Sequence, residues 1–160
     1  MTPLTQITYT ALPTIQVRAY QQGGQDAYGQ AAERQASDGN GNPCRHCLQL
    51  MPKGAGMLVL AHRPFKTLHS YAEVGPIFLC ADPCTGYGTQ TTQPPALRSS
   101  PDYLLKGYGD DDRIIYGTGA IIAVDRVAAH AAEVFADPKV AYIHIRSARN
   151  NCYQARIDRA

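Results

Sequence analysis

Four of the five cysteines of this chain fall into two close pairs, and this feature constrains the fold more than any other. Cys44 and Cys47 are separated by two residues, whereas Cys80 and Cys84 are separated by three. Two thiolates from one tight turn can bind a zinc ion at about 2.3 Å each, and a second pair then completes a tetrahedral site. Two short apolar runs lie between the pairs, and a hairpin of these runs would bring the second pair back beside the first.

Three interpretations of these cysteines stay open. They are a structural zinc site, a set of ordinary or free thiols, and a redox dithiol at Cys44 and Cys47. Cys80 ends an apolar run, where a buried thiol packs like a small hydrophobic side chain. Arg45 and His46 would lower a thiol pKa, but no thioredoxin-like βαβ pattern surrounds them. We expect His46 to face solvent, because ligation beside both neighbouring cysteines would be crowded.

Length and composition predict one globular domain covering residues 1–160. A chain of 160 residues can bury a real core, and 44% hydrophobic against 18% charged residues separates it from disordered sequences. A formal net charge of +2 gives no field that would favour nucleic acid or an anionic membrane. The partner we expect is a small molecule or a protein, and the oligomeric state stays open.

The amino-terminal segment, residues 1–20, shows neither a basic start nor a continuous apolar run of the kind that a signal peptide has. No segment approaches the roughly 20 apolar residues that span a bilayer. We therefore expect a soluble, cytoplasmic protein. In a reducing compartment, paired cysteines bind metal, act in redox chemistry or stay free more often than they form structural disulfides.

Short apolar or alternating runs, separated by turn-forming residues, predict most of the strands. They cover residues 6–12, 30–37, 57–62, 77–80, 103–108, 113–124, 140–146 and 152–159. Residues 15–20 fit a strand or a short helix equally well. Residues 86–101 are rich in Thr, Gln, Pro and Ser, which predicts a surface loop whose role stays open.

The clearest helix covers residues 125–136, with Asp125 as its expected N-cap and an apolar stripe at helical spacing. Several strands, one late helix and a terminal hairpin give an α+β pattern without regular βαβ alternation. We expect a mixed, mostly antiparallel sheet with this helix packed on one face and a C-terminal β-hairpin. The Cys44 loop should lie at one end of that sheet.

A second group of polar residues lies outside the cysteines, at Arg63, Glu73, His144 and Arg146. Two guanidinium groups, a carboxylate and an imidazole could bind a small anionic substrate and perform acid/base catalysis. The alternative is an Arg63–Glu73 ion pair and a polar sheet face. Whether the protein is an enzyme stays open at this point.

Several short blocks are spread over most of the chain, at residues 43–48 (PCRHCL), 63–65 (RPF), 71–78 (YAEVGPIF), 144–148 (HIRSA) and Cys152. Together these blocks resemble the bacterial family named domain of unknown function 1203. The resemblance implies a small stand-alone bacterial domain and no particular reaction. We therefore expect a binding or regulatory domain whose cysteine-rich loop holds structural zinc, with the enzyme and the thiol-redox protein as alternatives.

Overall fold

The computed structural model describes residues 5–160. The first four residues of the amino-terminal segment 1–20, for which no signal peptide is expected, lie outside the described residues. The described strands form two sheets in which every pair of neighbours is antiparallel. The larger sheet has the order β5-β1-β9-β8-β6-β7. Its strands are β1 (Ile7–Thr10), β5 (Thr89–Gln90), β6 (Asp102–Tyr108), β7 (Ala120–Ala123), β8 (Tyr142–Ser147) and β9 (Tyr153–Arg159).

The core of the larger sheet lies between its central strands and helix α2 (Val127–Val134). Ile143, Ile145 and Ile157 are fully buried, and α2 covers this face with an apolar stripe that includes Val127 and Ala131. This confirms the predicted amphipathic helix. The expected N-cap is wrong, because Asp125 lies in a short 3₁₀ turn (Val124–Arg126) and α2 begins without a side-chain cap.

The smaller sheet has the order β2-β3-β4 and carries the two cysteine pairs at one end. Its strands are β2 (Glu33–Ala36), β3 (Gly56–His62) and β4 (Gly75–Cys80). The ambiguous residues 15–20 form helix α1 (Thr14–Gln21), which packs on this sheet through the buried Val17. A helix fits better than a strand here because it buries one narrow stripe and leaves its other faces in water.

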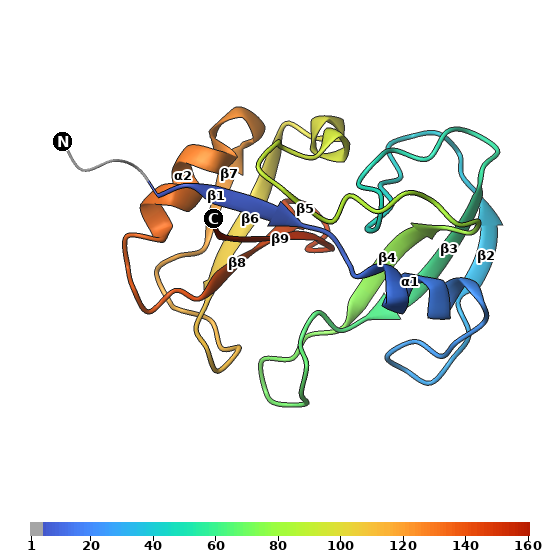
Figure 1. The fold of residues 1–160 in the computed structure, drawn as a ribbon, viewed down its shortest axis with the longest axis horizontal. Coiled ribbons are helices and arrows are strands. Elements are labelled where there is room, and N and C mark those ends of the chain that lie inside the picture. Colours follow the sequence, from blue (N-terminus) through green and yellow to red (C-terminus); the bar gives the residue numbers. More distant parts are fainter. Residues whose placement is uncertain (1–4) are drawn as a thin grey trace.

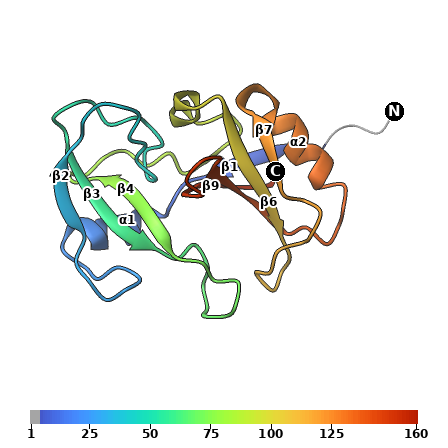
Figure 2. The ribbon, with the colours of Figure 1, turned by 180° about the vertical axis from the view of Figure 1, so that it is seen from behind.

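The two sheets lie side by side, each with its own helix, as opposite views show (Figures 1 and 2). Strand β1 belongs to the larger sheet, and the chain then crosses to α1 on the smaller one (Figure 1). The α+β class, the antiparallel pairing and the C-terminal β8-β9 hairpin are confirmed. The division of the strands between two sheets was not anticipated, because strand patterns do not specify which strands pair.

Residues 86–101 contain the short strand β5 and a 3₁₀ helix (Pro95–Ser99) rather than loop alone. This segment also supports the cysteine loop, since the backbone N–H of Tyr87 donates to His46 and that of Ala96 donates to Leu48. No helix among residues 5–160 has the length and apolar character needed to cross a bilayer.

Candidate functional site

The four paired cysteines converge on one point of the structure. The sulfur atoms of Cys44, Cys47, Cys80 and Cys84 all lie within 4.8 Å of one another, and the Sγ atoms of Cys44 and Cys84 are 3.9 Å apart. Cys44 is buried and the other three are partly buried. Within residues 5–160 this is the one cluster of His, Cys, Asp and Glu side chains with a metal-site arrangement.

The first pair is held by a tight turn that closes on its own backbone. The N–H of Leu48 donates to the carbonyl of Cys44 at 2.9 Å, and the N–H of Cys44 donates to the carbonyl of Gln49 at 3.0 Å. Leu48 has a φ of 53°, a left-handed conformation that a non-glycine residue adopts at some energetic cost. This turn directs both Cys44 and Cys47 toward the same point.

The second pair is placed by the β3-β4 hairpin and by α1. Cys80 ends β4, opposite Met57 of β3, so the hairpin returns the chain to the first pair as predicted. The buried Gln21 of α1 donates from Nε2 to the carbonyl of Cys80 at 2.9 Å. Arg18, one turn earlier on the helix, donates to the carbonyl of Cys84 at 2.9 Å. Helix α1 therefore fixes the backbone at both ends of the Cys80–Cys84 turn.

His46 is fully buried, so the expectation that it faces solvent is wrong. Its Nδ1 lies 3.0 Å from the sulfur of Cys84, and its Nε2 lies 2.8 Å from the hydroxyl of Thr14. The ring therefore contacts the second cysteine pair through Cys84 and helix α1 through Thr14. Burial lowers the pKa of His46, which keeps the imidazole neutral with one N–H to donate.

The thiols influence one another strongly. Hydrogen bonds from Cys47 and Cys80 lower the pKa of the Cys44 thiol well below its usual range. The same bonds raise the pKa of Cys47 and Cys80, and burial raises the pKa of Cys84 to about 12. The cluster therefore favours ionisation of one thiol and opposes ionisation of the others. A bound cation removes this opposition, because it stabilises all four thiolates together.

The spacing of the sulfurs fits a tetrahedral zinc ion. Four sulfurs at about 2.3 Å from one Zn²⁺ lie about 3.8 Å from one another, close to the 3.9 Å between Cys44 and Cys84. The backbone N–H of Cys80 also donates to the Cys44 sulfur at 3.3 Å, an interaction that stabilises a thiolate. The four cysteines are therefore arranged so that they could hold a metal.

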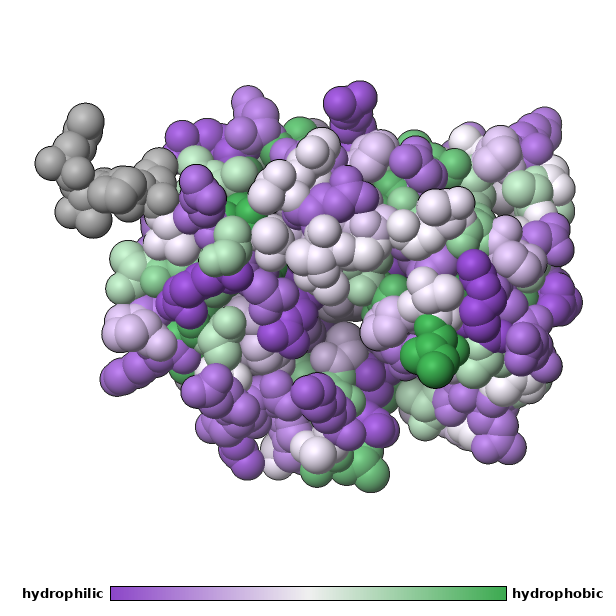
Figure 3. Space-filling model, in the orientation of Figure 1, coloured by the Kyte–Doolittle hydropathy of each residue, from purple (hydrophilic) through white to green (hydrophobic). Residues whose placement is uncertain are grey.

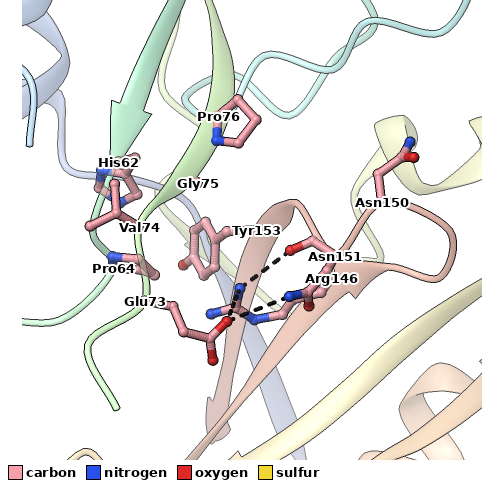
Figure 4. Close-up of a pocket in the computed structure, with 10 residues that line it drawn as sticks. All are labelled: His62, Pro64, Glu73, Val74, Gly75, Pro76, Arg146, Asn150, Asn151 and Tyr153. Carbon is pink, nitrogen blue, oxygen red and sulfur yellow. Dashed lines mark hydrogen bonds and ion pairs between the residues drawn. The ribbon is translucent and has the colours of Figure 1, made fainter. Parts of the chain in front are cut away.

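The structure brings together three of the four residues in the second predicted group. Glu73 pairs with Arg146 at 3.4 Å (Figure 4). Arg146 also donates from its other terminal nitrogen to Nδ1 of His144 at 3.3 Å. Arg63 is not part of this chain of contacts, and the suggested Arg63–Glu73 pair does not form. Glu73 instead pairs with Lys106 at 3.0 Å.

The polar residues His144 and Arg146 of strand β8 are buried. They are 1% and 4% exposed, and Phe65, from the segment that follows β3, packs on the His144 ring. His144 contacts the rings of Phe65 and Tyr108, and burial lowers the pKa of His144 well below its usual value. Burial opposes ionisation of Glu73, but the adjacent Arg146 and Lys106 outweigh it and lower its pKa.

Sequence reasoning missed His62, a buried histidine on β3 that lies between the two sheets. Both of its ring nitrogens lack hydrogen-bond partners among the described residues, and its ring centroid lies 5.8 Å from that of Tyr153 on β9. Burial lowers its pKa to about 4. The feature of the sequence that could have pointed to His62 is its place at the end of an otherwise apolar run. A polar residue there is unusual for a buried strand unless its side chain has a partner.

Comparison with known proteins identifies a family but no described activity. Residues 41–159 match the family described as Protein of unknown function (DUF1203). The chain belongs to this family. The match covers both cysteine pairs and the β8-β9 hairpin, in agreement with the resemblance in the sequence. No curated protein and no solved structure gives a significant match to this member of DUF1203.

Proposed function

We propose that this DUF1203 protein is a zinc-stabilised binding domain in which Cys44, Cys47, Cys80 and Cys84 hold one Zn²⁺. The observation that carries the proposal is the convergence of four sulfur atoms, from two distant parts of the chain, within 4.8 Å of one another. Chance packing of thiols does not require all four to face a common point, whereas a tetrahedral metal site does.

The role of the metal in this proposal is structural. Four protein sulfurs fill a tetrahedral coordination shell, which leaves no position for water or substrate. When bound, zinc would supply a rigid link between the 44–47 turn and the end of β4. The donation from His46 to Cys84 would hold that thiolate in place, as groups behind metal ligands commonly do.

We also propose that the protein is cytoplasmic, because the reducing conditions there keep four neighbouring thiols available to a metal. The fifth cysteine, Cys152, lies outside the cluster and contacts the carbonyl of Asn150 at 3.7 Å. It therefore provides a matched control for any effect of removing a thiol.

Metal analysis tests the proposal directly. The chain is purified without chelator, and its zinc content is measured by elemental analysis for wild type, Cys44→Ser and Cys152→Ser. We expect one zinc per chain in wild type and in Cys152→Ser, and a large loss in Cys44→Ser. Wild-type protein that takes up no zinc, even after reduction and incubation with Zn²⁺, would exclude the proposal.

Thiol titration separates the zinc site from the thiol-redox alternative. A zinc-bound cluster reacts slowly with an alkylating reagent until chelator is added, whereas a redox pair changes its thiol count with oxidant and reductant. We favour zinc because the redox alternative needs two thiols, and the structure groups four.

The catalytic alternative has weaker support. Glu73 is paired with two cations, and His144 is enclosed by aromatic rings, so neither is placed like a free general base. Arg63 is separate from both. These residues are better suited to shaping a binding site than to transferring protons.

A further inference from the structure

A cavity of about 450 Å³ lies between the segment that follows β3 and strand β9. Its walls come from both sheets, with His62, Arg63 and Phe65 on one side and His144, Tyr153 and Arg156 on the other. The space-filling view shows a hollow near the middle of this face, between the two halves of the molecule (Figure 3). The volume falls within the range of small-molecule sites.

The charge on the cavity walls favours an anion. Asp158 is the one acidic residue among those that line it, and Arg156 holds both of its carboxylate oxygens at 2.9 and 3.0 Å. Arg63 and Lys66 form no ion pair with any residue between 5 and 160. The Nε of Arg63 donates to the carbonyl of Phe65 at 3.3 Å, which leaves its terminal nitrogens and the Lys66 ammonium available for an oxyanion that enters the cavity.

His62 supplies an independent sign of a ligand. It is 3% exposed, it lines the cavity, and neither ring nitrogen has a hydrogen-bond partner among residues 5–160. A buried polar atom without a partner is destabilising, and a bound molecule that accepts the N–H of His62 removes this cost. His62 also lines a smaller adjoining cavity of about 180 Å³, where the buried Nε of Arg146 is unpaired as well (Figure 4).

The rest of the lining favours a ligand with an apolar body. Leu12, Pro13, Pro64 and the rings of Phe65 and Tyr153 form much of the wall. A bare inorganic ion would leave this surface in contact with water, whereas an aromatic or branched ligand would cover it.

We propose that this cavity binds a small organic anion, whose carboxylate or phosphate group meets Arg63, Lys66 and His62 and whose apolar body packs against Phe65 and Tyr153. The proposal goes beyond the zinc site and does not depend on the identity of the metal. It explains why two free cations and an unpaired buried imidazole surround the same space.

Titration calorimetry with simple probes tests this proposal on the full chain. The probes are benzoate, phenyl phosphate, the uncharged benzyl alcohol, and inorganic phosphate. We expect saturable binding of benzoate or phenyl phosphate with a Kd on the order of 1 mM, and at least about tenfold weaker binding of the other two. The stronger of the two aromatic anions identifies the oxyanion as carboxylate or phosphate.

Variants at exposed or partly exposed positions keep the test independent of folding. Arg63→Gln and Lys66→Gln should each weaken binding of the aromatic anion about tenfold, because each removes a charge-assisted contact. Arg149→Gln is the matched control, since Arg149 pairs with Asp102 and does not line the cavity. The imidazole signals of His62 should shift in NMR spectra when benzoate or phenyl phosphate is added.

Two results would overturn the proposal. One is the absence of saturable binding of both aromatic anions to folded wild-type protein at tens of millimolar. The other is binding that Arg63→Gln and Lys66→Gln leave unchanged or that does not move the His62 signals. Zinc content measured on the same samples shows whether a failure here coincides with loss of the metal.

Discussion

The guanidinium of Arg45 donates from Nε to the backbone carbonyl of Tyr153 at 2.7 Å, deep between the two sheets. Arg45 belongs to the cysteine turn and Tyr153 begins β9, so this bond ties the proposed zinc site to the larger sheet. A second donation, from Nη1 to the carbonyl of Pro43 at 2.7 Å, holds the guanidinium in place, and Arg45 is 3% exposed. Arg45, one of the two residues between Cys44 and Cys47, thus joins the halves of the molecule.

Replacing Arg45 by lysine should destabilise the protein by about 1–3 kcal/mol, because one ammonium on a flexible stem cannot reproduce both directed bonds to carbonyls. Urea unfolding followed by circular dichroism measures the change. Arg149→Lys is the control, since Arg149 lies on the surface. An Arg45→Lys midpoint equal to that of wild type would show that the bond to Tyr153 contributes nothing to stability.

The convergence of the cysteines was predictable from the sequence because it depends on local patterns. Two apolar runs between Cys47 and Cys80 read as strands, and a hairpin of those strands returns the chain to its starting point. The position of His46 was not predictable. Its burial depends on Thr14 and Cys84, which lie far from it in sequence and meet it only after α1 docks on the smaller sheet.

Removing zinc should lower the thermal unfolding midpoint, since binding free energy at a structural site adds to folding free energy. A strong chelator should lower the midpoint of wild type and of Cys152→Ser by at least about 10 °C. Cys44→Ser should already unfold at the lower temperature, and chelator should not change it further. Equal midpoints with and without chelator in zinc-loaded wild type would contradict a structural role for the metal.

Thr14→Val should weaken zinc binding about tenfold, although Thr14 does not touch the sulfurs. Its hydroxyl contacts Nε2 of His46, whose other nitrogen contacts Cys84, and such supporting groups typically change metal affinity 10–100-fold. Competition with a chromophoric chelator gives the affinity. Thr89→Val is the control, because Thr89 is exposed and its hydroxyl contacts the hydroxyl of Thr10 and no other side chain among residues 5–160. Unchanged affinity in Thr14→Val would remove His46 from the supporting role.

Gly86 leaves room for His46, and a side chain there should disturb the cluster. A Cβ at position 86 would lie 2.8 Å from Nε2 of His46 and 3.1 Å from the Thr14 hydroxyl, too close for unstrained contact. Gly86→Ala should therefore cost about 1–3 kcal/mol and lower zinc affinity. Gly75→Ala, where a Cβ meets nothing within 4 Å, should have little effect on either measurement. Chemical unfolding and chelator competition together distinguish a local clash from general destabilisation.

The sequence did not reveal which polar residues would be enclosed. The alternation of β8 correctly grouped His144 with Arg146 on one face of the strand. When the opposite face is apolar, however, such a polar face can be exposed to water or covered by a second layer of protein. Here the segment after β3 supplies that layer through Phe65. Pairing between distant strands decides burial, and no local pattern in the sequence encodes it.

His62 should stay neutral in the folded protein far below the pH at which a free histidine takes up a proton. Its pKa is lowered to about 4 by burial, with smaller effects from the nearby charges of Arg45, Arg63 and Arg146. Between pH 6.5 and 4 the unfolded chain binds the proton and the folded chain does not, so stability falls as the pH falls. Over the whole window this amounts to about 3 kcal/mol. Acid also protonates cysteine thiolates, so the measurement is an NMR titration of the His62 ring itself. A midpoint near 6.5 would show that the ring is open to water.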